Sequence, residues 1–267
     1  MKFNTKCVHG SGKPDSTGAI SPAIYMSSTF SHPKLGDTTG YQYTRESNPT
    51  RDRLEQLIAG LEEGTDALAF SSGMAAVDAV FHLFSPGDHI ILGDDLYGGS
   101  IRMFTNIYEQ NGIEFTYVGT SDLDAVKAAF KPNTKAVYIE TPTNPMMEIT
   151  DIRALCALAH ERNALVIIDN TFLSPYFQKP LTLGADIVVH SGTKFIGGHH
   201  DVISGFTIVK DDELAAKLRL TYKTVGACLS AMDSWLVIRG VKTLALRMEQ
   251  HQKNAIALAE WLKTQPK

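Results

Sequence analysis

One lysine is set where it could do chemistry. Lys194 lies in VVHSGTKFIGGHH, residues 188–200, after a short apolar run and before two glycines and two histidines. It is either an ordinary surface lysine beside a turn or a nucleophile at the mouth of a strand. Asp169 ends another apolar run, ALVIID, earlier in the chain. An amine that can form a Schiff base, with an acid that can hold a proton on a ring nitrogen, predicts carbonyl chemistry on a bound cofactor.

Other polar side chains follow the ends of other predicted strands. In SSGMAA a helix opens at Gly73 and Met74, and the free N–H groups at a helix start favour a phosphate. Ser191 and Thr193 flank the lysine with hydroxyl groups, and Tyr97 in DDLYGGS could stack on a flat ring. Together with the lysine and the aspartate, these residues predict a site for pyridoxal 5'-phosphate (PLP).

These residues need a scaffold that brings strand ends together. Short apolar runs alternate with helical patterns, which predicts an α/β domain with a mostly parallel sheet flanked by helices. Ligands of such domains bind beyond the carboxyl ends of the strands. The predicted strands are residues 66–70, 89–93, 113–118, 136–140, 164–169 and 185–190, and the predicted helices are residues 74–84, 100–110, 123–130 and 152–162.

The composition limits the possible partners. The chain has 267 residues, of which 43% are hydrophobic and 20% charged, and its formal net charge is -4. This balance is typical of a globular protein and gives no reason to expect nucleic acid or an anionic membrane as a partner. No segment has the apolar pattern of a secretory signal or a membrane helix, and the three cysteines are in no CxxC spacing. We expect a cytoplasmic protein that acts on a small molecule.

The two ends of the chain differ from the middle. Residues 1–48 are rich in Gly, Ser, Pro and Thr with little periodicity, which predicts an extended N-terminal arm ordered by another surface. Residues 49–240 hold the alternating pattern and form the predicted cofactor-binding domain. Residues 241–267 have the periodicity of a long amphipathic helix, which we expect to lead toward a further domain.

Five motifs resemble one enzyme family. SSGMAA, DDLYGG, ETPTNP, DNTFLSPY and HSGTKFIGGHHD, in this order between Tyr41 and Arg239, are similar to the Cys/Met-metabolism enzymes that use PLP. That family includes cystathionine lyases, cystathionine gamma-synthase and methionine gamma-lyase. The resemblance implies the large domain of the aspartate-aminotransferase-like (type I) fold. It also implies a lyase that cleaves a C–S bond of cystathionine or a related thioether amino acid by α,β- or α,γ-elimination.

The resemblance also implies a role for each matching residue. Lys194 would bond the cofactor and act as the base, Asp169 would pair with the pyridine nitrogen, and Tyr97 would stack on the ring and help to move protons. Asn144 in TPTNP would bind the phenolic oxygen of the cofactor. The residues expected at the phosphate are Gly73, Met74, Ser191 and Thr193, joined by Tyr43 and Arg45 from the arm of a neighbouring subunit. The last pair implies a homo-oligomer, a tetramer built from dimers that share active sites.

Two departures from the family pattern qualify these expectations. The family has a further C-terminal domain whose arginine binds the substrate carboxylate, and no counterpart of that arginine is found before Lys267. We expect either a fragment of a longer enzyme or a short chain that binds PLP with little turnover. Gly99 stands where methionine gamma-lyases carry a cysteine, which favours the cystathionine enzymes.

Three alternatives remain open at this point. A synthase of the same family would replace the γ-substituent of an activated homoserine with cysteine instead of eliminating a thiol. A non-catalytic PLP-binding module would keep the cofactor site alone. His199, His200 and Asp201 suggest a metal-dependent hydrolase, but neighbouring side chains rarely converge on one ion, and we predict no metal site.

Overall fold

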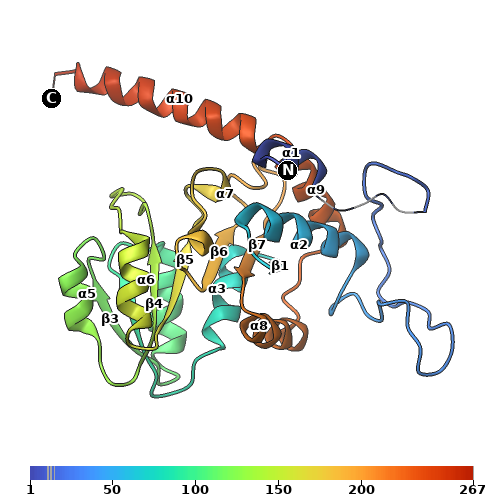
Figure 1. The fold of residues 1–267 in the computed structure, drawn as a ribbon, viewed down its shortest axis with the longest axis horizontal. Helices are drawn as coiled ribbons and strands as arrows, with labels where there is room; N and C mark the ends of the chain where they lie inside the picture. The colour runs from blue at the N-terminus through green and yellow to red at the C-terminus, as the bar shows by residue number, and fades with distance from the viewer. Residues whose placement is uncertain (11, 13, 15, 267) are drawn as a thin grey trace.

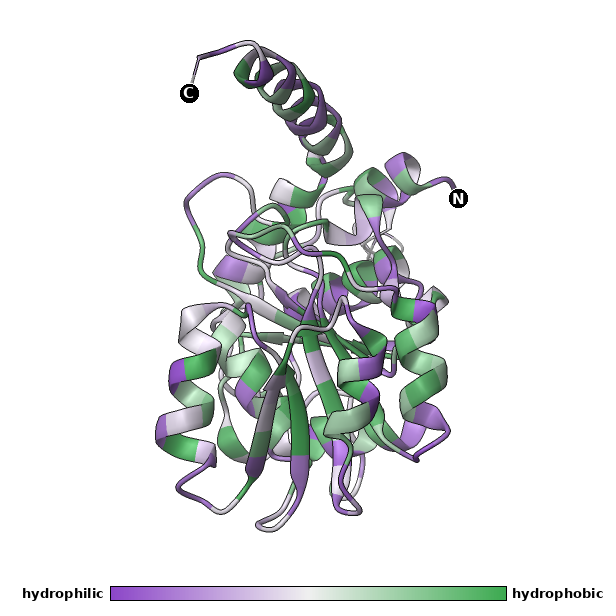
Figure 2. Cartoon of the chain, turned by 90° about the vertical axis from the view of Figure 1, so that its left-hand side faces the viewer, coloured by the Kyte–Doolittle hydropathy of each residue, from purple (hydrophilic) through white to green (hydrophobic). Residues whose placement is uncertain are grey.

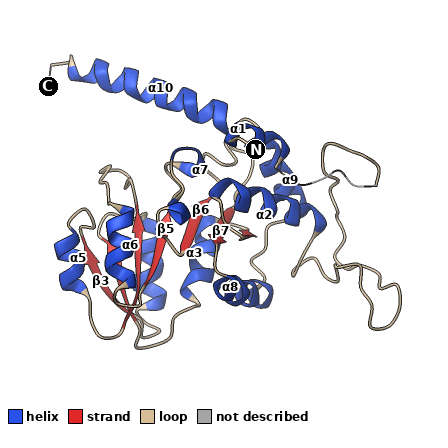
Figure 3. Cartoon of the chain, in the orientation of Figure 1, coloured by secondary structure: helices blue, strands red, loops and turns tan. Residues whose placement is uncertain are grey.

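A seven-stranded sheet forms the centre of the molecule, with helices on both of its faces (Figure 1, Figure 3). The computed structural model describes residues 1–10, 12, 14 and 16–266. Positions 11, 13 and 15 of the predicted arm and position 267 of the predicted last helix lie outside the described residues. None of the helices in the described part of the chain is both long and apolar enough to span a membrane.

The sheet is built from β1 (Asp66–Phe70), β2 (His89–Gly93), β3 (Glu114–Val118), β4 (Thr134–Glu140), β5 (Leu165–Asp169), β6 (Ile187–Ser191) and β7 (Gly205–Val209). Across the sheet these strands follow the order β1-β7-β6-β5-β4-β2-β3. All neighbours among β2 to β6 run parallel, whereas β7 runs antiparallel to both β1 and β6. The prediction of an α/β domain with a mostly parallel sheet is confirmed.

β7 is a strand that the sequence analysis did not predict. Its five residues, GFTIV, are all buried, but Gly205 and Thr207 interrupt the apolar residues, and so short a pattern does not separate a strand from a helix. β7 matters to the site because its first residue, Gly205, lies against Ser72 and Gly73, where the chain passes from β1 into the next helix. A Cβ atom at Gly205 would overlap the carbonyl of Ser72 and approach the Cα of Gly73 to 2.7 Å. Glycine therefore permits this close approach of two backbones.

One face of the sheet is covered by α3 (Gly73–Phe81), α4 (Gly98–Met103) and α8 (Asp212–Val225). α4 continues into a π-helical turn, Phe104–Tyr108, and the ring of Phe104 stacks on Phe81 of α3 with centroids 4.3 Å apart. Full burial of an aromatic ring of this size contributes roughly 2 kcal/mol or more to folding. Tyr138 of β4 packs edge-on against the same two rings. This aromatic core fixes the helices that stand beside the carboxyl ends of the strands.

The opposite face is covered in two halves. α2 (Pro49–Glu62) and α9 (Ala231–Val241) pack over β1, β6 and β7, and α5 (Leu123–Ala129) and α6 (Ile152–His160) pack over β2, β4 and β5. Figure 2 shows the mainly hydrophobic strands enclosed between helices. Two short helices, α7 (Ser174–Phe177) and a 3-10 turn (Pro180–Thr182), connect β5 to β6.

The ends of the chain lie outside this layered body. α1 (Phe3–His9) packs on α2 through the buried Cys7, and the described residues from 16 to 48 contain neither helix nor strand beyond one isolated bridge. α10 (Leu244–Lys263) begins beside α9 and then extends away from the body (Figure 1). From His251 onward each described residue of α10 is exposed. The division into arm, cofactor-binding domain and linking helix stays a prediction.

Candidate active site

Three of the predicted segments meet at the carboxyl ends of neighbouring strands of the sheet. Glu140, the last residue of β4, is in register with Asp169, the last residue of β5. Because the two strands are parallel, both side chains point to the same face, which is covered by α3 and α4. β6 pairs Val189 with Asp169, so the loop that carries Lys194 leaves the sheet at this edge.

Asp169 has hydrogen-bond donors but no cationic side chain in contact. The backbone N–H of Thr171 donates to its Oδ1 at 3.0 Å, and the hydroxyl of Tyr138 donates to its Oδ2 at 3.5 Å. Among the described residues no Lys or Arg is found among the groups that shift its pKa. Loss of solvent around the carboxyl raises the pKa of Asp169, and the hydrogen bonds of Thr171 only partly offset this. The carboxylate is therefore poised to gain from a positively charged ligand.

Thr171 joins the aspartate to the lysine loop. While its N–H binds Asp169, its Oγ1 accepts a hydrogen bond of 2.7 Å from the N–H of Ser191. One residue thus fixes the end of β5 relative to the end of β6. Sequence reasoning did not single out Thr171, because a threonine after a strand is also common in ordinary turns.

The lysine loop is a tight turn braced from α10. The N–H of Lys194 donates to Ser191 O at 3.3 Å, and Gly198 N–H donates to Lys194 O at 2.8 Å. Arg247 of α10 donates to Phe195 O at 2.6 Å and to Gly240 O at 3.0 Å. Lys194 itself is exposed, so its amine is accessible on a backbone that is held in place.

Thr193 is placed next to the lysine but its hydroxyl is already engaged. Its Oγ1 donates to Ser204 O at 3.2 Å and accepts from Ser204 N–H at 3.1 Å. A hydroxyl has one proton, so Thr193 can donate to a phosphate only by releasing the carbonyl of Ser204. The predicted contact of Thr193 with the phosphate would need this exchange.

The start of α3 faces the lysine loop. Ser72 caps the helix: its Oγ accepts from Ala75 N–H at 3.1 Å, and its carbonyl accepts from Ala76 N–H at 3.2 Å. The N–H groups of the first two helical residues, Gly73 and Met74, precede these bonds and remain for a ligand. A Cβ atom on Gly73 would lie 2.8 Å from the Cβ of Ser191, so glycine lets the two segments form a narrow cradle.

Tyr97 stands beside the carboxyl pair. The residue is 56% exposed, and its backbone N–H donates to Glu140 Oε2 at 3.2 Å. A Cβ atom on Gly99 would overlap the Tyr97 ring. The glycine noted in the sequence therefore has a physical effect in this chain, because any side chain there would displace the ring.

The remaining predicted residues lie in loops. Asn144 is exposed in the loop after β4. Tyr43 and Arg45 of the arm stack on one another, with the guanidinium carbon 5.4 Å from the ring centroid, and Arg45 also donates to the carbonyl of Lys223 in α8. Their role toward the phosphate of a neighbouring subunit stays a prediction.

Known proteins share this arrangement over the whole chain. Residues 4–267 match the family described as Cys/Met metabolism PLP-dependent enzyme. The chain belongs to this family. It is 50% identical over 267 residues to the cystathionine gamma-lyase of Bacillus subtilis (strain 168), a match that covers 100% of the chain and 70% of the relative.

The chain is also similar to an enzyme with synthase activity and to a solved lyase structure. The chain is 47% identical over 256 residues to the cystathionine gamma-synthase/O-acetylhomoserine (thiol)-lyase of Bacillus subtilis (strain 168), covering 96% of the chain and 69% of the relative. The crystal structure of cystathionine gamma-lyase from Lactobacillus plantarum complexed with L-serine matches with a TM-score of 0.98 and 50% identity, over 100% of this chain and 70% of that one. The type I fold predicted from the motifs is confirmed.

The cofactor of this Cys/Met-metabolism enzyme is PLP, and the residues at the sheet edge fit it. Asp169 is a carboxylate without a cation, which suits a protonated ring nitrogen. The free N–H groups at the start of α3 and the cradle between Gly73 and Ser191 suit a phosphate. The amine of Lys194 suits the aldehyde carbon.

A buried network supports the site from the other face of the sheet. Glu62, at the end of α2, accepts at Oε1 from His190 Nε2 at 2.6 Å and from Asn170 Nδ2 at 2.8 Å. Gln178 extends the network, because its Nε2 donates to Asn170 Oδ1 at 3.0 Å and to the carbonyl of Thr141 at 2.9 Å. The ends of β4, β5 and β6 are thus tied together. Sequence analysis missed Glu62, since an acid at a helix end resembles an ordinary solvent-facing residue.

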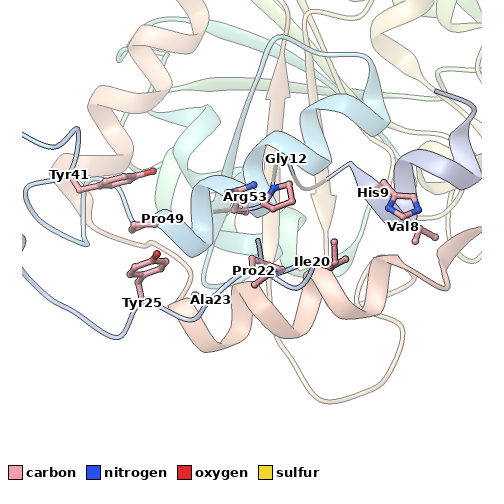
Figure 4. A pocket seen from close by; sticks show the side chains of 12 residues that line it. Val8, His9, Gly12, Ile20, Pro22, Ala23, Tyr25, Tyr41, Pro49 and Arg53 are labelled. Atoms are coloured by element: carbon pink, nitrogen blue, oxygen red, sulfur yellow. The ribbon is translucent and has the colours of Figure 1, made fainter. Parts of the chain in front are cut away.

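Two other features lie apart from this site. In the described part of the chain no group of three or more His, Cys, Asp or Glu side chains is placed to hold a metal ion, and the ring of His199 contacts Gly197 O at 2.8 Å. A cavity of about 420 Å³ lies between the arm and the start of α2, where Tyr25 and Tyr41 stand near one end and Val8 and His9 near the other (Figure 4). None of its twelve lining residues is a predicted site residue.

Proposed function

We propose that this enzyme is a PLP-dependent lyase of sulfur amino-acid metabolism. It cleaves a C–S bond of cystathionine, or of a related thioether amino acid, by α,β- or α,γ-elimination. The observation that carries this proposal is the meeting of the lysine loop, Asp169 and the start of α3 at one sheet edge, in a chain half identical to a cystathionine gamma-lyase. The thioether and one water molecule give a thiol, a 2-oxo acid and ammonia: the C–S bond breaks in the elimination, and water then hydrolyses the released imine.

The proposed roles follow from the chemistry of the side chains. Bound PLP supplies a ring that withdraws electrons from the substrate Cα. Asp169 keeps the proton on the ring nitrogen, and Lys194 removes the proton from the substrate Cα. For a leaving group on Cγ, a second proton must leave Cβ, and Lys194 is the base within reach of that step. Tyr97 holds the ring by stacking and helps to move protons.

The remaining residues hold the cofactor. The N–H groups of Gly73 and Met74 and the hydroxyl of Ser191 bind the phosphate, and Thr193 joins them if it releases Ser204. Asn144 binds the phenolic oxygen. These assignments are supported by the cradle between α3 and the lysine loop, since a dianion needs several N–H and O–H donors in a small space.

We also infer that the enzyme is a cytoplasmic homo-oligomer, a tetramer built from dimers that share active sites through Tyr43 and Arg45. The arm supports this inference, because Ile20, Met26 and Leu35 are 76%, 76% and 103% exposed and would gain from a partner surface. Sedimentation velocity of the chain with PLP tests it: a monomer at micromolar concentration would contradict the shared site.

Borohydride reduction tests the proposed nucleophile. The chain is incubated with PLP, reduced, digested and mapped by mass spectrometry, and we expect the adduct on Lys194. Lys194→Ala should lose that adduct and lower the elimination rate by at least about 1000-fold, because it removes both the bond to the cofactor and the base. Lys127→Ala on the exposed face of α5 is the matched control. A main adduct on another lysine would contradict the assignment.

A synthase is the second candidate, favoured by the 47% identity to a cystathionine gamma-synthase/O-acetylhomoserine (thiol)-lyase. It would replace the γ-substituent of an activated homoserine with cysteine. Two assays on the same preparation separate the reactions: ammonia release from cystathionine, and cystathionine formation from cysteine and O-acetylhomoserine. Cystathionine formation without ammonia release would replace the lyase assignment by the synthase.

A further inference from the structure

Glu140 is a buried acid that none of the proposed steps uses. Its side chain is only 7% exposed at the end of β4, directly beside Asp169 in the register of the sheet. The groups that face it are Asp169 of β5, Asp95 and Tyr97 from the segment after β2, and Tyr138 on its own strand. None of these is a cation. The hydrogen-bond donor found for Glu140 is the backbone N–H of Tyr97.

This setting is unusual for a residue with a purely structural task. Buried carboxyls are ordinarily paired with a cation, because removal of the charge from water costs several kcal/mol. A glutamine would accept the same N–H bond without that cost. An acid placed between a carboxylate and the ring expected to stack on the cofactor is typical of a functional site.

We propose that Glu140 is a positioning residue of the active site, which fixes the main chain of Tyr97 and controls the charge beside Asp169. This inference rests on the proposed function, since Tyr97 and Asp169 act on the cofactor only if PLP binds at these strand ends. Glu140 acts through both neighbours: it holds the residue that carries the ring, and it adds a second negative charge only when it ionises.

The charge of Glu140 follows from its surroundings. Burial and the nearby carboxylates of Asp169 and Asp95 raise the pKa of Glu140 to about 8, while the N–H of Tyr97 acts in the opposite direction. At neutral pH Glu140 is therefore mostly protonated. Because the folded state binds this proton more tightly than the unfolded state, Glu140 lowers the stability of the cofactor-free chain as pH rises from about 4.5 to about 8.

A double-mutant cycle tests the link to Tyr97. The affinity of the cofactor-free chain for PLP is measured by equilibrium dialysis for the wild type, Glu140→Leu, Tyr97→Ala and the double variant. Glu140→Leu removes the acceptor and should weaken PLP binding about fivefold. Tyr97→Ala should weaken it roughly tenfold. The double variant should bind no more weakly than Tyr97→Ala, because no ring is then left to position.

Glu140→Gln keeps the acceptor and removes the acid. We expect its PLP affinity at pH 7 to stay within about twofold of wild type. Its thermal unfolding midpoint, measured without PLP and relative to wild type, should rise between pH 5 and pH 8.5, since the variant lacks the proton that wild type loses. Glu161→Gln, whose side chain is 75% exposed, is the matched control and should change neither measurement.

The outcomes separate the two proposals. If wild type binds PLP but Glu140→Leu binds equally well, or if the losses of Glu140→Leu and Tyr97→Ala multiply, the role of Glu140 is overturned and the lyase assignment stands. The same holds if Glu140→Gln has the wild-type pH profile, and this variant decides the question where Glu140→Leu does not fold. A wild-type chain that binds no PLP would overturn the proposed function and the role of Glu140 with it.

Discussion

The two faces of the sheet treat buried acids differently at the same strand ends. On the α2 face, Glu62 is fully buried and accepts from His190 and Asn170 at one oxygen. On the α3 face, Glu140 and Asp169 stand side by side, and no cationic side chain of the described chain pairs with either. Both faces give their acids hydrogen-bond donors, but the donors to Glu62 include an imidazole, whereas the α3 face places two acids next to each other.

The difference separates support from chemistry. A carboxylate with an imidazole and an amide as donors holds strand ends in place, and it changes little when a ligand arrives. Two neighbouring acids are costly in the empty protein, and a cationic ligand relieves that cost. At the carboxyl ends of β4, β5 and β6, the α2 face therefore carries the fixed support and the α3 face carries the reactive site. Only the strands themselves separate the two.

Among the changes that test this comparison of the two faces, a substitution at Asp169 should have a large effect on activity. Asp169→Asn keeps the size of the side chain and removes the charge, so the elimination rate with PLP should fall at least about 100-fold. Its pKa is raised in the folded state, so ionised Asp169 destabilises the cofactor-free chain above the pKa of the unfolded state. The unfolding midpoint of the variant without PLP at pH 7.5 should therefore equal or exceed that of wild type.

A steady-state assay and thermal unfolding check this pair of effects. Asp124→Asn, an exposed aspartate of α5, is the control and should leave both unchanged. If Asp169→Asn keeps an activity within tenfold of wild type, the negative charge of Asp169 is not needed for catalysis. The proposed difference between the two faces of the sheet would then be wrong.

Glu62 should show the opposite behaviour. Glu62→Ala leaves the buried donors of His190 and Asn170 without their acceptor and should lower the free energy of unfolding by about 3 kcal/mol. Urea denaturation of the cofactor-free chain measures this loss. Glu63→Ala, at the next residue, removes only a surface ion pair with Lys179 and should cost less than about 1 kcal/mol. Equal stability of Glu62→Ala and wild type would show that the network is not part of the frame.

Among the changes that test this comparison, a substitution at Gly73 should have the smallest effect, and it tests where the phosphate binds. Gly73→Ala brings a Cβ atom to 2.8 Å from that of Ser191 and should weaken PLP binding about tenfold, which corresponds to about 1.4 kcal/mol. Equilibrium dialysis measures the affinity. Gly60→Ala in α2 meets no atom within 4 Å and should leave PLP binding unchanged. A Gly73→Ala variant that binds like wild type would mean that the cradle does not hold the phosphate.

Local patterns predicted the strands that end at the site but not the contacts that support it. Lys194 and Asp169 could be singled out because each follows an apolar run that reads as a buried strand. β7 was missed because its five buried residues include Gly205 and Thr207, which leave too short an apolar pattern to predict a strand. The bond between His190 and Glu62 joins residues 128 positions apart, and no local pattern encodes such a pair. Glu140 resembled an ordinary strand-end acid until the register placed it beside Asp169.

The long stretch of chain between β1 and β7 sets the earliest time at which these two strands can pair during synthesis. β1 lies at an edge of the described sheet and pairs with β7, and Thr65 bonds to Val209, 144 residues later. At 5 to 20 residues per second, the ribosome needs roughly 7 to 30 seconds to supply that partner. For this interval β1 and the turn before α3 lack their neighbour, so the phosphate end of the site is completed late and stays open to chaperones on the nascent chain.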